Sequence, residues 1–339
     1  MNPACPVKLN LQHVACDLCG GTDTAQVTRS SDHEHGVAGQ FNVVRCTRCG
    51  LHYLNPRPAP DSIGACYPHD YYAYAAAGSE RASPRFKQRI KRLIRSSPAL
   101  STVARQIAPL RHLAADSAIA ADIADWIKPG KVLDVGCGSG AFLDGMLENG
   151  WATFGIEPSA PAAAVSRAKG HAVLCQSATD VLDEKLAAQL FDVILMSHSL
   201  EHVHSPTEAL AHLRPILQPG TGHLIIEVPN VESLLTYWFG ELGLAFDTPR
   251  HLYLFSPDTL RAQLEKAGFE VCSVRHVSRP MQFVRCLRLL SEASTPESWR
   301  PAARASLEDR AVLEALESLA TLASTKNMGG SIRAVAIRQ

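Results

Sequence analysis

The sequence predicts an α/β protein built on a doubly wound parallel sheet, and the stretch from Lys131 to Gly140 is the first observation that predicts it. Residues 132–135 form a short apolar run broken only by Asp134, which is typical of a buried parallel strand. An apolar helical pattern begins directly after Gly140. A strand that turns into a helix through glycines brings bare backbone N–H groups and a positive helix end close to a ligand.

The second observation is a carboxylate at the end of the next predicted strand. Residues 151–156 form that strand, and Glu157 follows twenty-one positions after Gly136. A doubly wound sheet places an acidic residue there to accept hydrogen bonds from ribose hydroxyls. A glycine turn alone also arises for steric reasons. The strand and the carboxylate together favour a cofactor site over an α/β domain without a ligand.

The third observation is that helices and strands alternate along the chain after Glu157. The pattern predicts helices at 114–126, 158–169, 181–189, 207–217 and 256–267. It predicts strands at 172–175, 191–196, 221–228, 269–277 and 331–338. Residues 281–330 are helical outside this core, and Pro296 and Pro301 interrupt them. An insertion of this kind covers an active site, packs on the core or forms a dimer contact.

The glycine spacing separates two families of cofactor-binding proteins. It is Gly-x-Gly-x-Gly, with Asp134 two residues before the first glycine, and not the Gly-x-Gly-x-x-Gly of nicotinamide enzymes. This pattern resembles the class I S-adenosylmethionine-dependent methyltransferases over residues 116–280. The resemblance implies a Rossmann-like sheet of seven strands, with Asp134 facing the cofactor's ammonium group and Glu157 its ribose. The other cofactor contacts that it implies are Gly136, Gly138, Gly140, Ser177, Ala178 and Ser197.

Two Cys-x-x-Cys pairs precede this core, and a glycine follows each pair directly. They are Cys16 with Cys19 and Cys46 with Cys49. A two-residue gap lets both thiolates bind one ion, and two such pairs make a closed, structural Cys₄ site for which zinc is the expected metal. Redox use of one pair is the alternative, but neither pair lies in a thioredoxin-like context. The residues between the pairs fit a hairpin that ends at 41–44, and a module this small needs its metal to fold.

Composition limits the location and partners of the protein. Lys plus Arg and Asp plus Glu are both 33, which argues against nucleic acid as a partner. No apolar run approaches the roughly 20 residues that span a bilayer. Ten cysteines without a secretion signal indicate a reducing compartment, so we expect a cytoplasmic protein.

Two stretches between the cysteines and the core have more than one interpretation. Residues 67–74 contain four tyrosines, which suit either a ligand surface or packing between domains. Residues 81–111 carry nine basic side chains and no acidic ones, with apolar residues at helical spacing. Such a helix contacts an anionic membrane surface or a phosphorylated substrate, or it packs on the core with its basic face in solvent.

The loop after the strand at 191–196 is a candidate acceptor site, because open α/β sheets bind ligands at strand ends. It reads Ser-His-Ser-Leu-Glu-His-Val from Ser197, and the methyltransferase family frequently has Leu-Glu-His-Val there. His198 is the histidine best placed to contact substrate. Glu201 and His202 are expected to brace the loop. The helical His-Glu-x-x-His pattern of zinc enzymes is absent, so the loop by itself predicts no metal.

Residues 246–256 contain a Pro-Arg-His-Leu run followed by Phe-Ser. This run resembles zinc-bearing methyltransferases of sugar and surface-polysaccharide pathways. Deoxysugar C-methyltransferases carry Glu-His at the comparable place, where this chain has Arg250 before His251. That departure favours oxygen or nitrogen methylation over carbon methylation. His251 and His198 are the candidate catalytic residues, because the ordinary pKa of histidine suits a general base.

These features predict four segments: a zinc module at 1–66, a tyrosine-rich linker and basic helix at 67–115, a methyltransferase core at 116–280, and a helical insertion with the last strand at 281–339. The expected activity is methyl transfer from S-adenosylmethionine to a small-molecule acceptor, a sugar or sugar conjugate. The alternatives are a ribosomal RNA methyltransferase, which the basic helix favours, and a cofactor-binding scaffold without turnover. The sequence leaves the oligomeric state undefined.

Overall fold

The computed structural model describes residues 9–67, 119, 123, 127–294, 306–307 and 309–338. Contacts divide the chain into two compact units. Unit 1 combines Met1–Pro68 with Ala178–Gln339, and unit 2 is His69–Ser177. The basic stretch 81–111 and the tyrosine stretch after Tyr67 lie outside the described residues, and so does the predicted helix 114–126 apart from two buried isoleucines. The division into four segments stays a prediction.

Unit 2 contains the predicted glycine turn between a strand and a helix. Its strands are β6 (Lys131–Val135), β7 (Ala152–Ile156) and β8 (Ala172–Leu174), and its helices are α5 (Ala141–Glu148) and α6 (Ala160–Ala168). The strands pair in parallel, with Val135 opposite Ile156 and Ile156 opposite Leu174. Val132, Leu133 and Val135 are buried, as the apolar run predicts.

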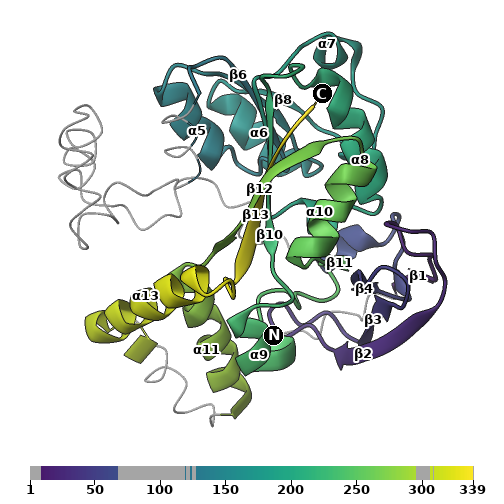
Figure 1. Ribbon diagram of the computed structural model, residues 1–339, viewed down its shortest axis with the longest axis vertical. Helices are drawn as coiled ribbons and strands as arrows, with labels where there is room; N and C mark the ends of the chain where they lie inside the picture. The colour runs from purple at the N-terminus through teal and green to yellow at the C-terminus, as the bar shows by residue number, and fades with distance from the viewer. Residues whose placement is uncertain are drawn as a thin grey trace. The chain divides into compact units, whose positions relative to one another are not determined.

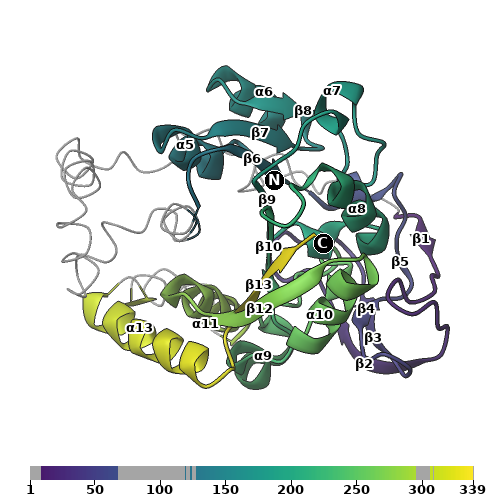
Figure 2. The same cartoon turned by 45° about the horizontal axis from the view of Figure 1, so that its top comes forward.

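Unit 1 supplies the other four strands of the main sheet, which are β9 (Val193–Ser197), β10 (His223–Pro229), β12 (Glu270–Val277) and β13 (Ser331–Ile337). β9 and β10 are parallel, whereas β13 runs antiparallel to both β10 and β12. The seven-stranded order is β12-β13-β10-β9-β6-β7-β8 (Figure 1 and Figure 2). The predicted doubly wound α/β sheet of seven strands is confirmed.

Unit 1 contains six described α-helices, and three of them begin at serine caps. The six are α7 (Glu184–Ala187), α8 (Pro206–Leu213), α9 (Leu234–Phe239), α10 (Pro257–Lys266), α11 (Pro280–Ser294) and α13 (Arg310–Thr325). Ser205, Ser233 and Ser256 each accept a hydrogen bond from a backbone N–H in the first turn. Two of the predicted helices were longer than the observed ones. The helix at 181–189 is only the four residues of α7, and the helix at 207–217 becomes a 3₁₀ turn at Arg214–Ile216, because Pro215 has no N–H to donate.

The helical insertion before β13 builds a small core of its own. Buried residues of α9, α11 and α13 pack together there: Leu235, Phe283, Cys286, Leu316, Ala320 and Ala323 (Figure 2). The described part of the insertion therefore has a packing role. No helix among the described residues is long and apolar enough to cross a membrane.

The N-terminal region forms a four-stranded sheet, and one strand of this sheet comes from the segment that follows His251. Three of its strands are β2 (Thr24–Ser30), β3 (Phe41–Cys46) and β4 (His52–Leu54), which follow the predicted hairpin. The fourth is β11 (Tyr253–Leu254), which pairs antiparallel with β4 (Figure 1). Two short strands, β1 (Leu11–Gln12) and β5 (Arg57–Pro58), pair beside it. The segment around His251 is thus held by the N-terminal module.

Candidate active site

The glycine turn of unit 2 is closed by Glu157. Its Oε2 accepts a hydrogen bond of 2.8 Å from the Gly138 N–H, and its Oε1 accepts one of 2.8 Å from the Ser159 N–H. Gly136 and Gly138 have φ values of 85° and 53°, which favour glycine. Each carboxylate oxygen has a second lone pair, so Glu157 both fixes the turn and retains acceptor capacity for ribose hydroxyls.

Asp134 is the buried acidic residue just before this turn. Its side chain is 5% exposed, and burial together with the charge of Glu157 raises its pKa to about 7. A carboxyl group in this state gains from a cationic partner, because a positive charge favours its ionised form. The observation fits the ammonium group that the family resemblance implies beside Asp134.

Gly140 has a steric function. It adopts φ 83° as the N-cap of α5, and a Cβ there would lie 2.5 Å from the Ser166 Oγ and 2.9 Å from the His171 Cδ2. Any side chain would therefore push α6 away. The remaining predicted cofactor contacts lie at or after strand ends. Ser177 follows β8, the next residue, Ala178, is buried, and Ser197 is the last residue of β9.

His198 follows β9 and lies between two buried carboxylates of unit 1. Its Nδ1 is 3.5 Å from Glu201 Oε1, and its Nε2 is 3.5 Å from Glu227 Oε1. Burial alone would lower its pKa, but the two carboxylates outweigh burial and raise it to about 9. Its φ of 53° is unusual for a residue with a side chain. His198 is therefore a cation and a hydrogen-bond donor near neutral pH.

His251 comes from the segment before β11 and faces the same loop. Its Nδ1 is 2.9 Å from the Ala245 carbonyl oxygen, and its Nε2 is 3.9 Å from Glu201 Oε1. Because a carbonyl oxygen only accepts, Nδ1 carries the proton and Nε2 presents a lone pair. Burial, followed by the nearby charge of His202, lowers the pKa of His251 to about 4. The ordinary histidine pKa assumed from the sequence therefore does not hold here.

Glu201 and His202 lie in a 3₁₀ turn at Leu200–His202, between His198 and His251. The ring of His202 meets the ring of His251 edge-on, with centroids 4.7 Å apart. Its Nδ1 lies 3.0 Å from the Arg250 carbonyl oxygen and 3.1 Å from the Tyr67 hydroxyl. The structure thus brings the two candidate histidines together around Glu201.

Arg250, the departure noted in the sequence, is a fully buried ion-pair centre. Its guanidinium binds Asp32 in a two-pronged contact of 2.8 and 2.9 Å, and binds Asp247 at 2.6 and 3.1 Å. It also donates to the Cys66 carbonyl oxygen at 3.1 Å. Asp32 belongs to the N-terminal module, so Arg250 connects that module to the His251 segment.

Glu227 is a site residue that the sequence analysis missed. It is fully buried in β10, where it accepts hydrogen bonds from Arg279 at 2.6 Å and Arg333 at 2.9 Å. Burial alone would raise its pKa, but His198 and these two guanidinium groups outweigh burial and lower it. The available signal was an acidic residue inside the apolar run 224–228.

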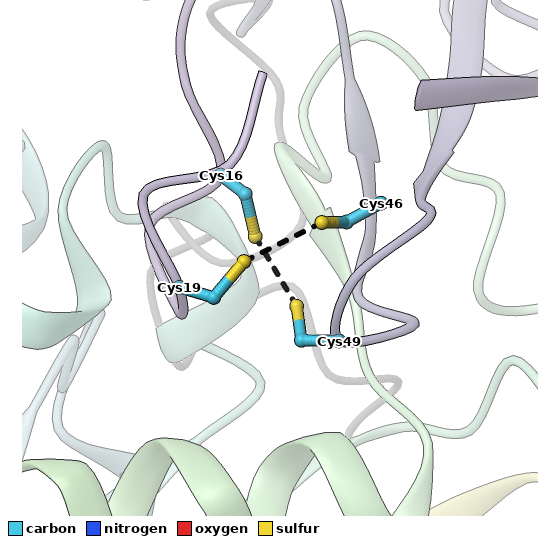
Figure 3. A group of neighbouring side chains, drawn as sticks. All are labelled: Cys16, Cys19, Cys46 and Cys49. Carbon is cyan, nitrogen blue, oxygen red and sulfur yellow. Dashed lines mark hydrogen bonds between the residues drawn. The ribbon is translucent and has the colours of Figure 1, made fainter. Parts of the chain in front are cut away.

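The four predicted metal ligands converge in the N-terminal module (Figure 3). The Cys16 and Cys49 sulfurs are 3.4 Å apart, and the Cys19 and Cys46 sulfurs are 3.5 Å apart. All four sulfurs lie within 4.8 Å of one another. A tetrahedral zinc ion with Zn–S bonds of about 2.3 Å places its sulfurs about 3.8 Å apart, so the donor set fits that ion. The backbone supports it, since Gly20 and Gly50 donate to the carbonyls of Cys16 and Cys46.

The first cysteine pair is bound to two helices of unit 1 through Asp17. The Asp17 carboxylate accepts hydrogen bonds from the Thr207 N–H at 2.9 Å and from Gln263 at 2.9 Å. The Asp17 carbonyl accepts a bond from Lys266 at 2.6 Å. Thr207 lies in α8 and the other two lie in α10, so the metal module is part of the same compact unit as the His198 cluster.

Comparisons with known proteins agree with this architecture. A family model described as a methyltransferase domain matches residues 67–274, more than half of the chain. The chain therefore belongs to this family of methyltransferase domains. Its domain is that of an enzyme that depends on S-adenosylmethionine, which confirms the coarser part of the resemblance seen in the sequence.

Several curated relatives are named ubiquinone biosynthesis O-methyltransferase. The one from Hahella chejuensis is 29% identical over 157 residues, which cover 43% of this chain and 66% of the relative. One from Pseudomonas aeruginosa is 29% identical over 154 residues, covering 42% and 65%. The chain thus spans just under two thirds of the length of these relatives.

Solved structures with a similar fold share little sequence. A methyltransferase dependent on S-adenosylmethionine from Archaeoglobus fulgidus is 20% identical, with a TM-score of 0.43, covering 64% of this chain and 92% of that chain. The magnesium protoporphyrin IX methyltransferase from Synechocystis is 16% identical, with a TM-score of 0.42, covering 65% and 80%.

Proposed function

We propose that the protein methylates a hydroxyl group of a small molecule, with S-adenosylmethionine as methyl donor. The observation that carries this proposal is the His198–Glu201–His251 cluster, which presents a fixed imidazole lone pair beside a buried carboxylate. Methyl transfer is an in-line displacement, so the chain mainly aligns the acceptor, excludes water and takes up the proton of the hydroxyl. The Nε2 of His251 is the atom placed to act on that proton.

Oxygen is the favoured methylated atom for two reasons. A residue other than glutamate precedes His251, and the curated relatives are named O-methyltransferases. The resemblance of residues 246–256 to sugar-pathway enzymes supports a sugar or sugar conjugate as acceptor. The names of the relatives support a second candidate, an intermediate of ubiquinone biosynthesis.

The test is methyl incorporation from labelled S-adenosylmethionine. Purified full-length protein is offered nucleotide sugars and, separately, hydroxylated precursors of ubiquinone. Formation of S-adenosylhomocysteine together with an O-methylated product from either class supports the proposal. Product methylated on carbon or nitrogen contradicts the choice of oxygen, and turnover only with ribosomal RNA contradicts a small-molecule acceptor.

The cofactor is proposed to bind through the glycine turn, with Glu157 on the ribose and Asp134 on the ammonium group. The further contacts proposed are the backbones of Gly136, Gly138 and Gly140, and Ser177, Ala178 and Ser197. The buried Asp134 supports this assignment, because burial and the charge of Glu157 raise its pKa and a neighbouring ammonium group would favour its ionised form.

We expect the affinity for S-adenosylhomocysteine to depend on pH through Asp134. Below its pKa of about 7 the carboxyl is protonated in the free protein, and binding an ammonium group requires it to lose that proton. Affinity should therefore rise as pH rises from 5 to 7, by up to about tenfold per unit, and level off above. Calorimetry at several pH values measures this. Asp134→Asn should bind more weakly with a flat profile, and a flat wild-type profile would contradict the assignment.

The Cys₄ cluster is proposed to hold a structural zinc ion. We expect about one zinc per chain in the purified protein and none at this site in Cys46→Ser, because three remaining thiolates leave the tetrahedral shell open. Since β4 pairs with β11, loss of the metal should also loosen the His251 segment. Elemental analysis and hydrogen exchange at residues 247–256 measure both effects. Cys272→Ser, an exposed cysteine outside the cluster, is the matched control. Equal zinc content in Cys46→Ser and the control would exclude the site.

A further inference from the structure

We infer that Glu201, His202 and His251 form a second metal site in unit 1, beside His198. This site binds a divalent first-row transition ion. One donor atom from each of the three residues lies within 4.8 Å of the others. The inference rests on the proposed function for what the ion does, but the binding of the ion can be tested by itself.

The first argument is that the Glu201 carboxylate is buried and accepts no hydrogen bond among the described residues, although the imidazoles of His198 and His251 lie at ion-pair distance. Its side chain is 1% exposed, and neither carboxylate oxygen accepts a hydrogen bond from the described residues. The nearest histidine nitrogens are 3.5 Å away on His198 and 3.9 Å away on His251, too far for good hydrogen bonds. A buried carboxylate that accepts no hydrogen bond is costly, and coordination of a metal cation is one way to compensate that cost.

The second argument is the orientation of the two imidazoles. His251 directs Nδ1 at the Ala245 carbonyl oxygen, 2.9 Å away, and His202 directs Nδ1 at the Arg250 carbonyl oxygen, 3.0 Å away. Each Nδ1 is therefore the protonated nitrogen, and each Nε2 keeps its lone pair for a ligand. Metal-binding histidines characteristically donate their other ring N–H to a backbone carbonyl or carboxylate in this way.

The third argument concerns the type of ion. Two imidazoles and one carboxylate suit zinc, manganese, iron or cobalt, and leave coordination positions open for a substrate oxygen. Ligands around such an ion lie about 3.0–3.5 Å apart, so the side chains need to move inward by only about an ångström. The thiolate cluster is a closed site of different chemistry, so the two sites can be distinguished by spectroscopy.

The ion gives the cluster a defined role in the proposed reaction. An acceptor hydroxyl in an open position becomes more acidic and releases its proton to solvent. The oxygen electron pair then forms the C–O bond to the methyl group, while the electron pair of the C–S bond moves to sulfur and S-adenosylhomocysteine leaves. His251 in this case acts through the ion.

The test is titration of the full-length protein, with its thiolate site loaded with zinc, by Co²⁺. We expect one equivalent to bind with a visible spectrum that lacks thiolate charge-transfer absorption. Glu201→Gln keeps the shape of the side chain and should weaken Co²⁺ binding at least 100-fold, with the zinc content unchanged. Glu232→Gln, an exposed acid on the same unit, should bind like wild type. His202→Gln provides a second ligand variant.

Three results would overturn the inference: no Co²⁺ binding by wild type, equal binding by Glu201→Gln, or a spectrum with thiolate absorption. Activity measured in parallel separates this inference from the proposed function. O-methylation by a protein that binds no Co²⁺ refutes the metal site and leaves His251 as a direct base. Co²⁺ binding that depends on Glu201, without O-methylation of any small molecule, refutes the proposed function alone.

Discussion

Arg250→Ala is expected to destabilise unit 1 by about 3–5 kcal/mol, because it leaves buried carboxylates without their cation. The guanidinium is fully buried and holds Asp32 and Asp247 at once. A loss of this size should lower the unfolding midpoint by roughly 6–20 °C. Thermal unfolding followed by circular dichroism measures it.

Two variants control for the contribution of Arg250. Arg250→Lys keeps a charge but not the two-pronged contact with Asp32, so it should fall between alanine and wild type. Arg310→Ala breaks an exposed ion pair with Glu314 one helical turn away and should change the midpoint little. An Arg250→Ala protein that unfolds at the wild-type temperature would show that the network does not stabilise the fold.

His251→Ala is expected to lower turnover at least 100-fold, with affinity for S-adenosylhomocysteine nearly unchanged. Assistance to proton removal is typically worth about 10²–10⁴-fold in rate, whether the imidazole acts directly or as a ligand. The proposed cofactor contacts Asp134 and Glu157 belong to unit 2, so the substitution should leave them unaffected. Single-turnover rates and calorimetry measure the two quantities.

A purely structural His251 predicts a different pattern. Its bond to the Ala245 carbonyl also fixes the loop, so that function alone would appear as lost thermal stability with modest kinetic loss. His223→Ala is the matched control, since His223 begins β10 at the strand end opposite Pro229. Wild-type turnover in His251→Ala would show that His251 does not assist proton removal.

The sequence was sufficient for features that depend on local spacing. The turn between β6 and α5 follows from glycines and an apolar run, and its residues are near neighbours in the chain. The cysteine pairs are similar, because each Cys-x-x-Cys turn closes over a few residues, as the hydrogen bonds from Gly20 and Gly50 show. The helix starts predicted at 158, 207 and 256 lie within two residues of the observed ones, whereas the helix end near Pro215 was not predicted.

The His198–Glu201–His251 cluster depends on contacts between distant segments, which the spacing of residues in the sequence does not encode. Glu201 and His251 are fifty positions apart, and their segments are joined by a 2.8 Å hydrogen bond from the Leu252 N–H to the Glu201 carbonyl oxygen. From the sequence alone, only the ordinary histidine pKa could be assumed for His198 and His251. Folding raises that of His198 to about 9 and lowers that of His251 to about 4, because one lies between carboxylates and the other is buried.

The sequence by itself therefore determined the class of fold, the glycine turn after β6 and the clustering of the four cysteines. In each case a short motif, or a pair of them, carries both the geometry and the chemistry. Only the tertiary structure decided what Arg250 binds, which histidines share Glu201, and how each of them is charged. Those properties arise from burial and from electrostatic contacts between distant segments, and a charge is stabilised or destabilised only by the groups that folding places around it.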